Sequence, residues 1–126
     1  MSNKKKREDW PKRYGRGERF SDETVAKIKD GFIARRKQVD VAREYTYRVA
    51  ARMQAGKPAV QEVSMAKNFA TEVADKVTYE AVQIFGGMGY MRESVVERLY
   101  RDNRILSIGG GTHEIMNEII AKQLNL

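Results

Sequence analysis

Two long segments of this chain carry apolar residues three and four positions apart, the spacing of one face of an α-helix. On the first segment, 21–53, that face holds Val25, Ile28, Phe32, Val39, Ala42, Thr46, Val49 and Met53, and only Arg35 and Arg36 interrupt it. On the second, 59–85, it holds Val63, Ala66, Ala70, Val73, Val77, Ala81 and Ile84. No segment alternates as a strand would. The sequence therefore predicts an all-α fold, an antiparallel helical bundle whose two long helices form a hairpin.

Residues that begin and end helices stand at the expected places. Ser21 offers a side-chain oxygen as an N-cap, and Gly56 followed by Pro58 ends the first helix. A shorter helix is predicted over 94–101. A last helix begins near Thr112, whose hydroxyl can cap it. Each of these two apolar faces is called a stripe below. Most residues of the two stripes need no role beyond the core of such a bundle.

Composition restricts the kinds of site that the chain can hold. The 126 residues have room for one domain, and no apolar run is long enough to span a bilayer. The absence of cysteine excludes disulfides, thiolate ligands and thiol nucleophiles. His113 is the only histidine, so a histidine-based metal site has no second ligand of its kind. We expect no metal and, without a visible secretory segment, a cytoplasmic protein.

The net charge of +7 is concentrated at the beginning of the chain. Residues 1–20 hold eight basic and three acidic side chains, a net of +5, with Pro11 and two glycines among them. We expect a basic flexible arm over 1–20, followed by the helical bundle over 21–126. Such an arm could bind nucleic acid through phosphates, but aromatic residues for stacking are few in it, so nucleic acid is not the expected partner.

Two glycine-rich turns interrupt the helical pattern in the last third of the chain. The first follows Phe85 and includes Gly86 and Gly87, and the second is Gly109, Gly110 and Gly111. Glycines at a helix end are often simple C-caps, and a short glycine loop can be no more than a tight connection. Alternatively, the bare backbone admits a ligand, and the free amides at the following helix N-terminus attract an anion or a carbonyl oxygen.

The segments QIFGGMGY, VERLYRD and IGGGTHE, in this order, resemble the carboxy-terminal end of acyl-CoA dehydrogenases. The resemblance is clear over 39–126 and fades over 20–38. It implies that FAD is the cofactor and that the first turn contacts the flavin dinucleotide of a neighbouring subunit, through Gln83, Ile84, Phe85, Gly86 and Gly87. It also implies that Thr112, His113 and Glu114 face FAD, while Gly110 and Gly111 face the acyl-CoA substrate.

The sequence departs from the commonest family pattern at Gly110, where the resemblance leads us to expect a glutamate. That glutamate removes the α-proton of the acyl-CoA while a hydride leaves the β-carbon for the flavin. Isovaleryl-CoA and long-chain members also have a small residue there and bring the carboxylate from a preceding helix. No version of that helix is recognisable here, nor are the amino-terminal helical domain and the β-domain. We therefore expect no catalytic residue in this chain.

The remaining carboxylates fit ordinary ion pairs better than catalysis. They lie among arginines and lysines, and are Glu93, Glu97, Asp102 and Glu118. The simplest interpretation of His113 is a residue at a helix N-terminus without a chemical role.

The resemblance has two smaller departures. Val95 stands where the family often has proline, and Asn103 stands where it often has a small apolar residue.

Two functions of different kind follow. The first is the carboxy-terminal domain of an FAD-dependent acyl-CoA dehydrogenase, which forms trans-2-enoyl-CoA and passes electrons to an electron-transfer flavoprotein. The chain would supply flavin contacts and subunit packing and would be inactive alone. The alternative is a non-catalytic oligomerisation module that pairs with itself or with a complete dehydrogenase subunit through an uncovered apolar face.

Overall fold

The computed structural model describes residues 22–126, and all of its regular structure is helical. The predicted arm over 1–20 and the predicted Ser21 cap lie outside the described residues. Val25, Ile28 and Phe32, at the start of the first stripe, are described in their backbone only. The helices are α1 (Asp22–Gln54), α2 (Val60–Phe85), α3 (Gly87–Tyr90), α4 (Val95–Asn103), the 3₁₀ helix η2 (Arg104–Ser107) and α5 (His113–Gln123). None of them is long and apolar enough to cross a membrane.

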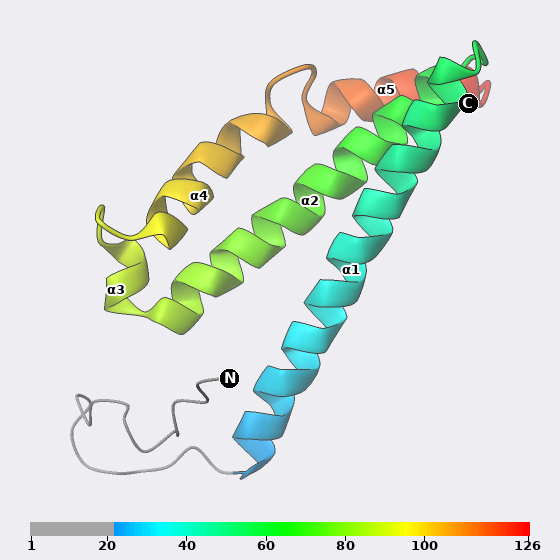
Figure 1. Ribbon diagram of the computed structural model, residues 1–126. Coiled ribbons are helices and arrows are strands. Elements are labelled where there is room, and N and C mark those ends of the chain that lie inside the picture. Colours follow the sequence, from blue (N-terminus) through cyan, green and yellow to red (C-terminus); the bar gives the residue numbers. More distant parts are fainter. Residues whose placement is uncertain (1–21) are drawn as a thin grey trace, which may run out of the picture.

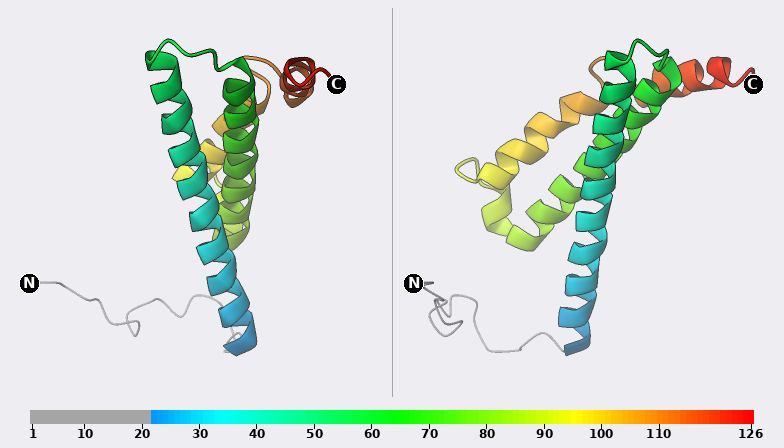
Figure 2. Two further views of the ribbon diagram at one scale, coloured as in Figure 1. Left: turned by 90° about the vertical axis from the view of Figure 1, so that its right-hand side faces the viewer. Right: turned by 45° about the vertical axis from the view of Figure 1, so that its right-hand side comes forward.

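Helix α2 is the central element of the fold. α1 runs antiparallel to it, and α4 returns along another side of it (Figure 1). α5 packs against α2 at the end where α1 and α2 are joined (Figure 2). The first turns of α1 extend past the last turn of α2 in these views. The predicted helical hairpin is therefore confirmed, with the shorter helices arranged around its second member.

The turn between α1 and α2 has the hydrogen bonds of a Schellman cap. Gly56 adopts a φ of 68°, its amide donates to Met53 O at 2.9 Å, and the amide of Lys57 donates to Arg52 O at 3.2 Å. Only glycine takes this left-handed conformation without steric cost, so Gly56 ends the helix where the sequence predicted.

The core among the described residues is built from small side chains. Its buried apolar members are Ala42, Val49, Ala59, Ala66 and Val73. Small residues let the two helices approach closely, but they remove little apolar area from water. The predicted apolar faces of α1 and α2 are wider than the surface that the two helices bury against each other. Met53 on α1 and Val63 and Ile84 on α2 belong to these faces but are exposed.

The break in the first stripe has a structural reason. Arg35 reaches across to α2, where its Nε and Nη2 donate to the Glu80 carboxylate at 2.6–2.9 Å. This hydrogen-bonded pair raises the pKa of Arg35 and lowers the pKa of Glu80. At this point of the α1–α2 interface, a bidentate ion pair between Arg35 and Glu80 therefore takes the place of an apolar contact.

We predict that Glu80→Gln lowers the thermal unfolding midpoint at neutral pH. Because the folded-state pKa of Glu80 lies below its ordinary 4.5, the pair stabilises the fold above that pH. The contribution is lost as the pH falls through the lowered pKa, so the two midpoints should converge in acid. Asp40→Asn, which removes the exposed pair of Asp40 with Arg36 on α1, is the control. An equal loss in both variants, or a loss independent of pH, would contradict this account.

Candidate functional site

The first glycine turn reverses the chain after α2. Gly86 caps α2 with a φ of 58°, and its amide donates to Gln83 O at 3.3 Å. The following residues form one helical turn, α3, within the predicted glycine-rich turn. Gly89 is buried there against α2, and a Cβ at this position would lie 2.7 Å from Val82 O and 2.8 Å from Phe85 Cβ. Gly89 is thus the residue that lets α3 fold back onto α2.

The predicted flavin contacts at this turn are on the surface. Ile84 is 54% and Phe85 55% exposed, and Gln83, Gly86 and Gly87 are exposed as well. A Cβ added at Gly86 or Gly87 would meet no atom within 4 Å. The bare backbone is therefore open to another molecule, as a contact across a subunit interface requires.

The second glycine loop, 108–111, connects η2 to α5. Gly110 and Gly111 adopt φ values of 71° and 112°, which side chains rarely adopt. A Cβ at Gly110 would meet nothing within 4 Å, whereas one at Gly111 would collide with Met116 Cε of α5. Thr112 then caps α5, because its Oγ1 accepts from the amide of Ile115 at 3.4 Å. The predicted cap at Thr112 is confirmed.

A row of polar side chains on α2 holds this loop and α5. Lys67 Nζ donates to Gly111 O at 2.5 Å, and Asn68 Nδ2 donates to Asn117 Oδ1 at 2.9 Å. His113 Nε2 lies 2.9 Å from Thr71 Oγ1. The other ring nitrogen, Nδ1, lies 3.5 Å from Glu72 Oε1, so both ring nitrogens of His113 face α2. These polar contacts hold α5 together with apolar residues that are only half-buried, such as Ile119 and Ile120.

Asp75 continues the polar row and holds the other end of the loop. Its Oδ1 accepts from Asn103 Nδ2 at 2.5 Å, and its Oδ2 accepts from Ser107 Oγ at 2.7 Å. Asn103 and Ser107 are 8% and 7% exposed, so both polar groups are buried. The hydrogen bond to Asp75 gives the buried Asn103 amide a structural role.

This polar row is a feature that the sequence pattern alone did not indicate. Its members Lys67, Asn68, Thr71 and Asp75 are spaced by one, three and four residues, which places them along one face of α2. That spacing was available in the sequence. A polar face opposite an apolar stripe usually faces solvent, however, and only the position of the loop shows that this one makes contacts.

The carboxylate that follows the loop is Glu114, in the first turn of α5. Hydrogen bonds from its own backbone amide and from the Thr112 hydroxyl lower the pKa of Glu114 below 4.5, which makes it a weaker base. The predicted ion pairs are present for three carboxylates: Glu97 with Arg101 at 3.0 Å, Asp102 with Arg101 at 3.1 Å, and Glu118 with Lys122 at 2.9 Å. Glu93 has no ion pair with a described residue.

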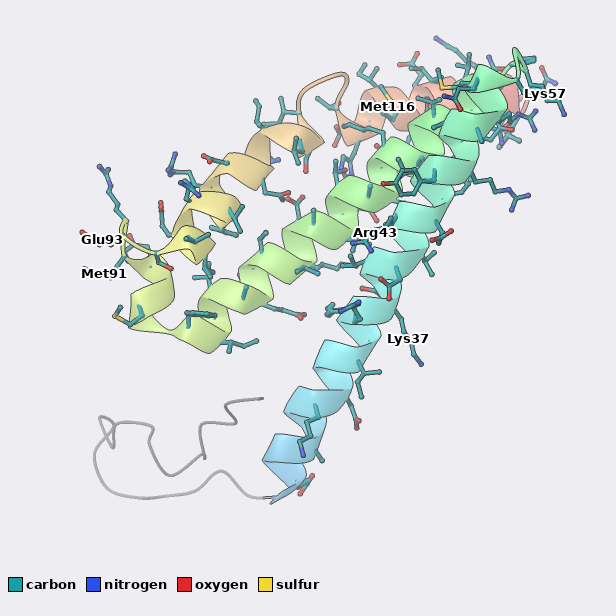
Figure 3. The ribbon with its side chains drawn as sticks, in the orientation of Figure 1. Lys37, Arg43, Lys57, Met91, Glu93 and Met116 are labelled. Atoms are coloured by element: carbon teal, nitrogen blue, oxygen red, sulfur yellow. The ribbon has the colours of Figure 1, made fainter. Side chains whose placement is uncertain are left out.

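The two sets of predicted site residues lie at different places along α2. Phe85 is 18 residues after Lys67, about 27 Å away at 1.5 Å per residue. Figure 3 shows Met91, just after the first turn, well apart from Met116 on α5. One chain therefore holds the two sets of residues well apart along α2.

A groove of about 890 Å³ between α2 and α4 contains none of the predicted flavin or substrate residues. Tyr79 and Tyr100 face each other in it, with ring centroids 6.4 Å apart. Its charged groups are mixed, and include Asp75, Glu97 and Arg101, which already pair with other residues. The groove shows no clear preference for a ligand of one charge.

The architecture and these motifs define an acyl-CoA dehydrogenase C-terminal domain, whose family model matches residues 26–125. The chain therefore belongs to the acyl-CoA dehydrogenase family, and the predicted all-α fold of this domain is confirmed.

Individual relatives agree with this family. A probable acyl-CoA dehydrogenase from Mycobacterium abscessus, known as a crystal structure, is 55% identical with a TM-score of 0.75, over 90% of this chain and 30% of its own. The probable acyl-CoA dehydrogenase YngJ of Bacillus subtilis is 41% identical over 69% of this chain and 23% of its own length. The caffeyl-CoA reductase–Etf complex subunit CarC of Acetobacterium woodii is 39% identical over the same two fractions. The chain thus spans less than a third of these relatives.

We predict that Gly89→Ala destabilises the fold by about 1–3 kcal/mol, the usual cost of forcing an atom into a packed contact. The added Cβ would have to displace backbone of α2. Gly87→Ala is the matched control, because its Cβ would meet nothing within 4 Å. Denaturant unfolding gives both free energies. Equal losses in the two variants would show that Gly89 is not a contact point.

Asp75→Ala should cost about 1–3 kcal/mol of unfolding free energy, because it leaves the buried polar groups of Asn103 and Ser107 without their acceptor. Asp30→Ala, at an exposed position on α1, should stay within about 0.5 kcal/mol of wild type. The same denaturant titration compares them. A loss at Asp75 no larger than at Asp30 would contradict the anchoring role.

Proposed function

We propose that this chain acts as the carboxy-terminal domain of an FAD-dependent acyl-CoA dehydrogenase. It contributes flavin contacts and subunit packing, and it is inactive alone. The observation that carries the proposal is the exposed, side-chain-free backbone at two glycine turns on a scaffold of this family. The homologous CarC, a subunit of a reductase–Etf complex, supports an electron-transfer flavoprotein as a partner.

The residues present fit a flavin dinucleotide. Gly86 and Gly87 leave open space over the end of α2, and Gly110 leaves open space before α5. Among the described residues, no hydrogen bond engages the backbone amides of Gly110, Gly111 and Thr112. Free amides at the N-terminus of an eleven-residue helix stabilise a negatively charged or carbonyl oxygen.

Each candidate residue then has a defined task. Gln83 to Gly87 present a surface to the flavin dinucleotide held by a neighbouring subunit, and Thr112, His113 and Glu114 face FAD at the other end of α2. Gly110 and Gly111 leave room for the thioester of the acyl-CoA. Bound FAD would accept the hydride that leaves the β-carbon of the substrate. The base that takes the α-proton is supplied by residues outside this sequence.

The first test of this function is FAD binding and acyl-CoA-dependent dye reduction, by the chain alone and mixed with complete dehydrogenase subunits. We expect no turnover by the chain alone. Gly87→Val should weaken FAD binding in the assembly about tenfold, because its side chain would fill the open contact surface. Gly31→Val, equally unhindered but on α1, is the control. Turnover by the isolated chain would refute the missing base, and unchanged FAD affinity in Gly87→Val would refute the contact.

A second candidate is a non-catalytic oligomerisation module. It is favoured by the many large apolar side chains that the described helices leave exposed, among them Ile33, Val41, Met53, Ile84 and Phe85. Such residues gain free energy when a partner covers them. Colourless oligomers that co-purify with a larger dehydrogenase would support this alternative, whereas a yellow assembly that requires the chain supports the first. A nucleic-acid function would depend on the arm, which lies outside the described residues.

A further inference from the structure

Lys67 makes the one side-chain hydrogen bond to the backbone of the second glycine loop among the described residues. It projects from α2 and donates from Nζ to Gly111 O at 2.5 Å, in a partly buried position. No ion pair joins Lys67 to a described carboxylate, so its positive charge acts on this carbonyl. A hydrogen bond from an ammonium group is about twice as strong as one between neutral groups.

This contact fixes the direction of the next amide. The peptide bonds of the described chain are trans, so the C=O of Gly111 and the N–H of Thr112 point in opposite directions. Because the carbonyl points to Lys67 on α2, the amide of Thr112 points away from α2. That amide belongs to the residue that caps α5 and is predicted to face FAD.

The loop needs such an external restraint. Gly109, Gly110 and Gly111 have no side chains to limit their dihedral angles, and a run of glycines has many conformations of similar energy. The bond from Lys67 selects one of them at the last peptide of the loop. Asp75, through Ser107, holds the first end in place.

We infer that Lys67 is a positioning residue: it orients the Gly111–Thr112 peptide so that the cap amide of α5 is presented outward, to the flavin. The inference rests on the proposed function for the identity of the ligand, whereas the effect of Lys67 on the loop does not depend on it. Lys67 itself touches neither cofactor nor substrate in this assignment.

The test of the loop uses the full 126-residue chain labelled with ¹⁵N. Lys67→Met keeps an unbranched side chain, one atom shorter, and removes the donors. Lys67→Arg restores a donor, and Lys76→Met removes an exposed lysine from the same helix. We expect the amide order parameters of 109–112 to fall from about 0.85 to below about 0.6 in Lys67→Met alone. Lys67→Arg should recover them. Unchanged order parameters in Lys67→Met, or a fall spread over α1 and α2, would overturn the inference, since the second result indicates general loss of stability.

The second part of the inference, that the Thr112 amide is presented to the flavin, is tested by FAD titration. The titration uses the same variants assembled with complete dehydrogenase subunits. Lys67→Met should bind FAD about tenfold more weakly, with recovery in Lys67→Arg and no change in Lys76→Met. Wild-type affinity in Lys67→Met despite a mobile loop would overturn the assignment of the amide to the flavin. No FAD binding by wild type would instead overturn the proposed function, and the order parameters would still decide whether Lys67 positions the loop.

Discussion

The fold depends on α2 making two kinds of contact on two of its faces. On one face small apolar residues such as Ala66 and Val73 pack against α1, with Arg35 and Glu80 paired at the same interface. On the other, Lys67, Asn68, Thr71 and Asp75 hold α4, η2, the glycine loop and α5 by hydrogen bonds. Hydrogen bonds are directional and apolar contacts are not. The polar face of α2 therefore restricts the position of the second glycine loop more than apolar packing could.

This division of contacts is consistent with the proposed role, in which the domain completes a site that other subunits also form. The core is small, no large side chain of the described residues is fully buried, and many apolar side chains remain on the surface. The two glycine turns are nevertheless held in defined conformations at separate ends of α2. Holding a glycine turn in one conformation depends on local anchoring more than on a large core.

The helices could be predicted closely, whereas their contacts could not. The apolar period gave α1 and α2 to within a residue or two, Gly56 gave the end of α1, and Thr112 gave the start of α5. Burial was less predictable, because Val63 and Ile84 match the predicted apolar face but are 38% and 54% exposed. For the site, the glycine turns were visible as motifs, but the roles of Lys67 and Asp75 were not, since each bonds a group more than 30 residues away.

The sequence by itself determined what is local: helix periodicity, caps, the glycines that permit left-handed backbone, and the absence of a carboxylate at Gly110. These features depend on residues that are neighbours along the chain, so they can be derived without knowing which distant segments meet. Only the tertiary structure decided that the polar face of α2 contacts the second glycine loop and α5. It also decided that Arg35 lies at the α1–α2 interface and that the two glycine turns are far apart. Those facts depend on which distant segments meet, and an amphipathic pattern has the same period whether its polar face meets solvent or another helix.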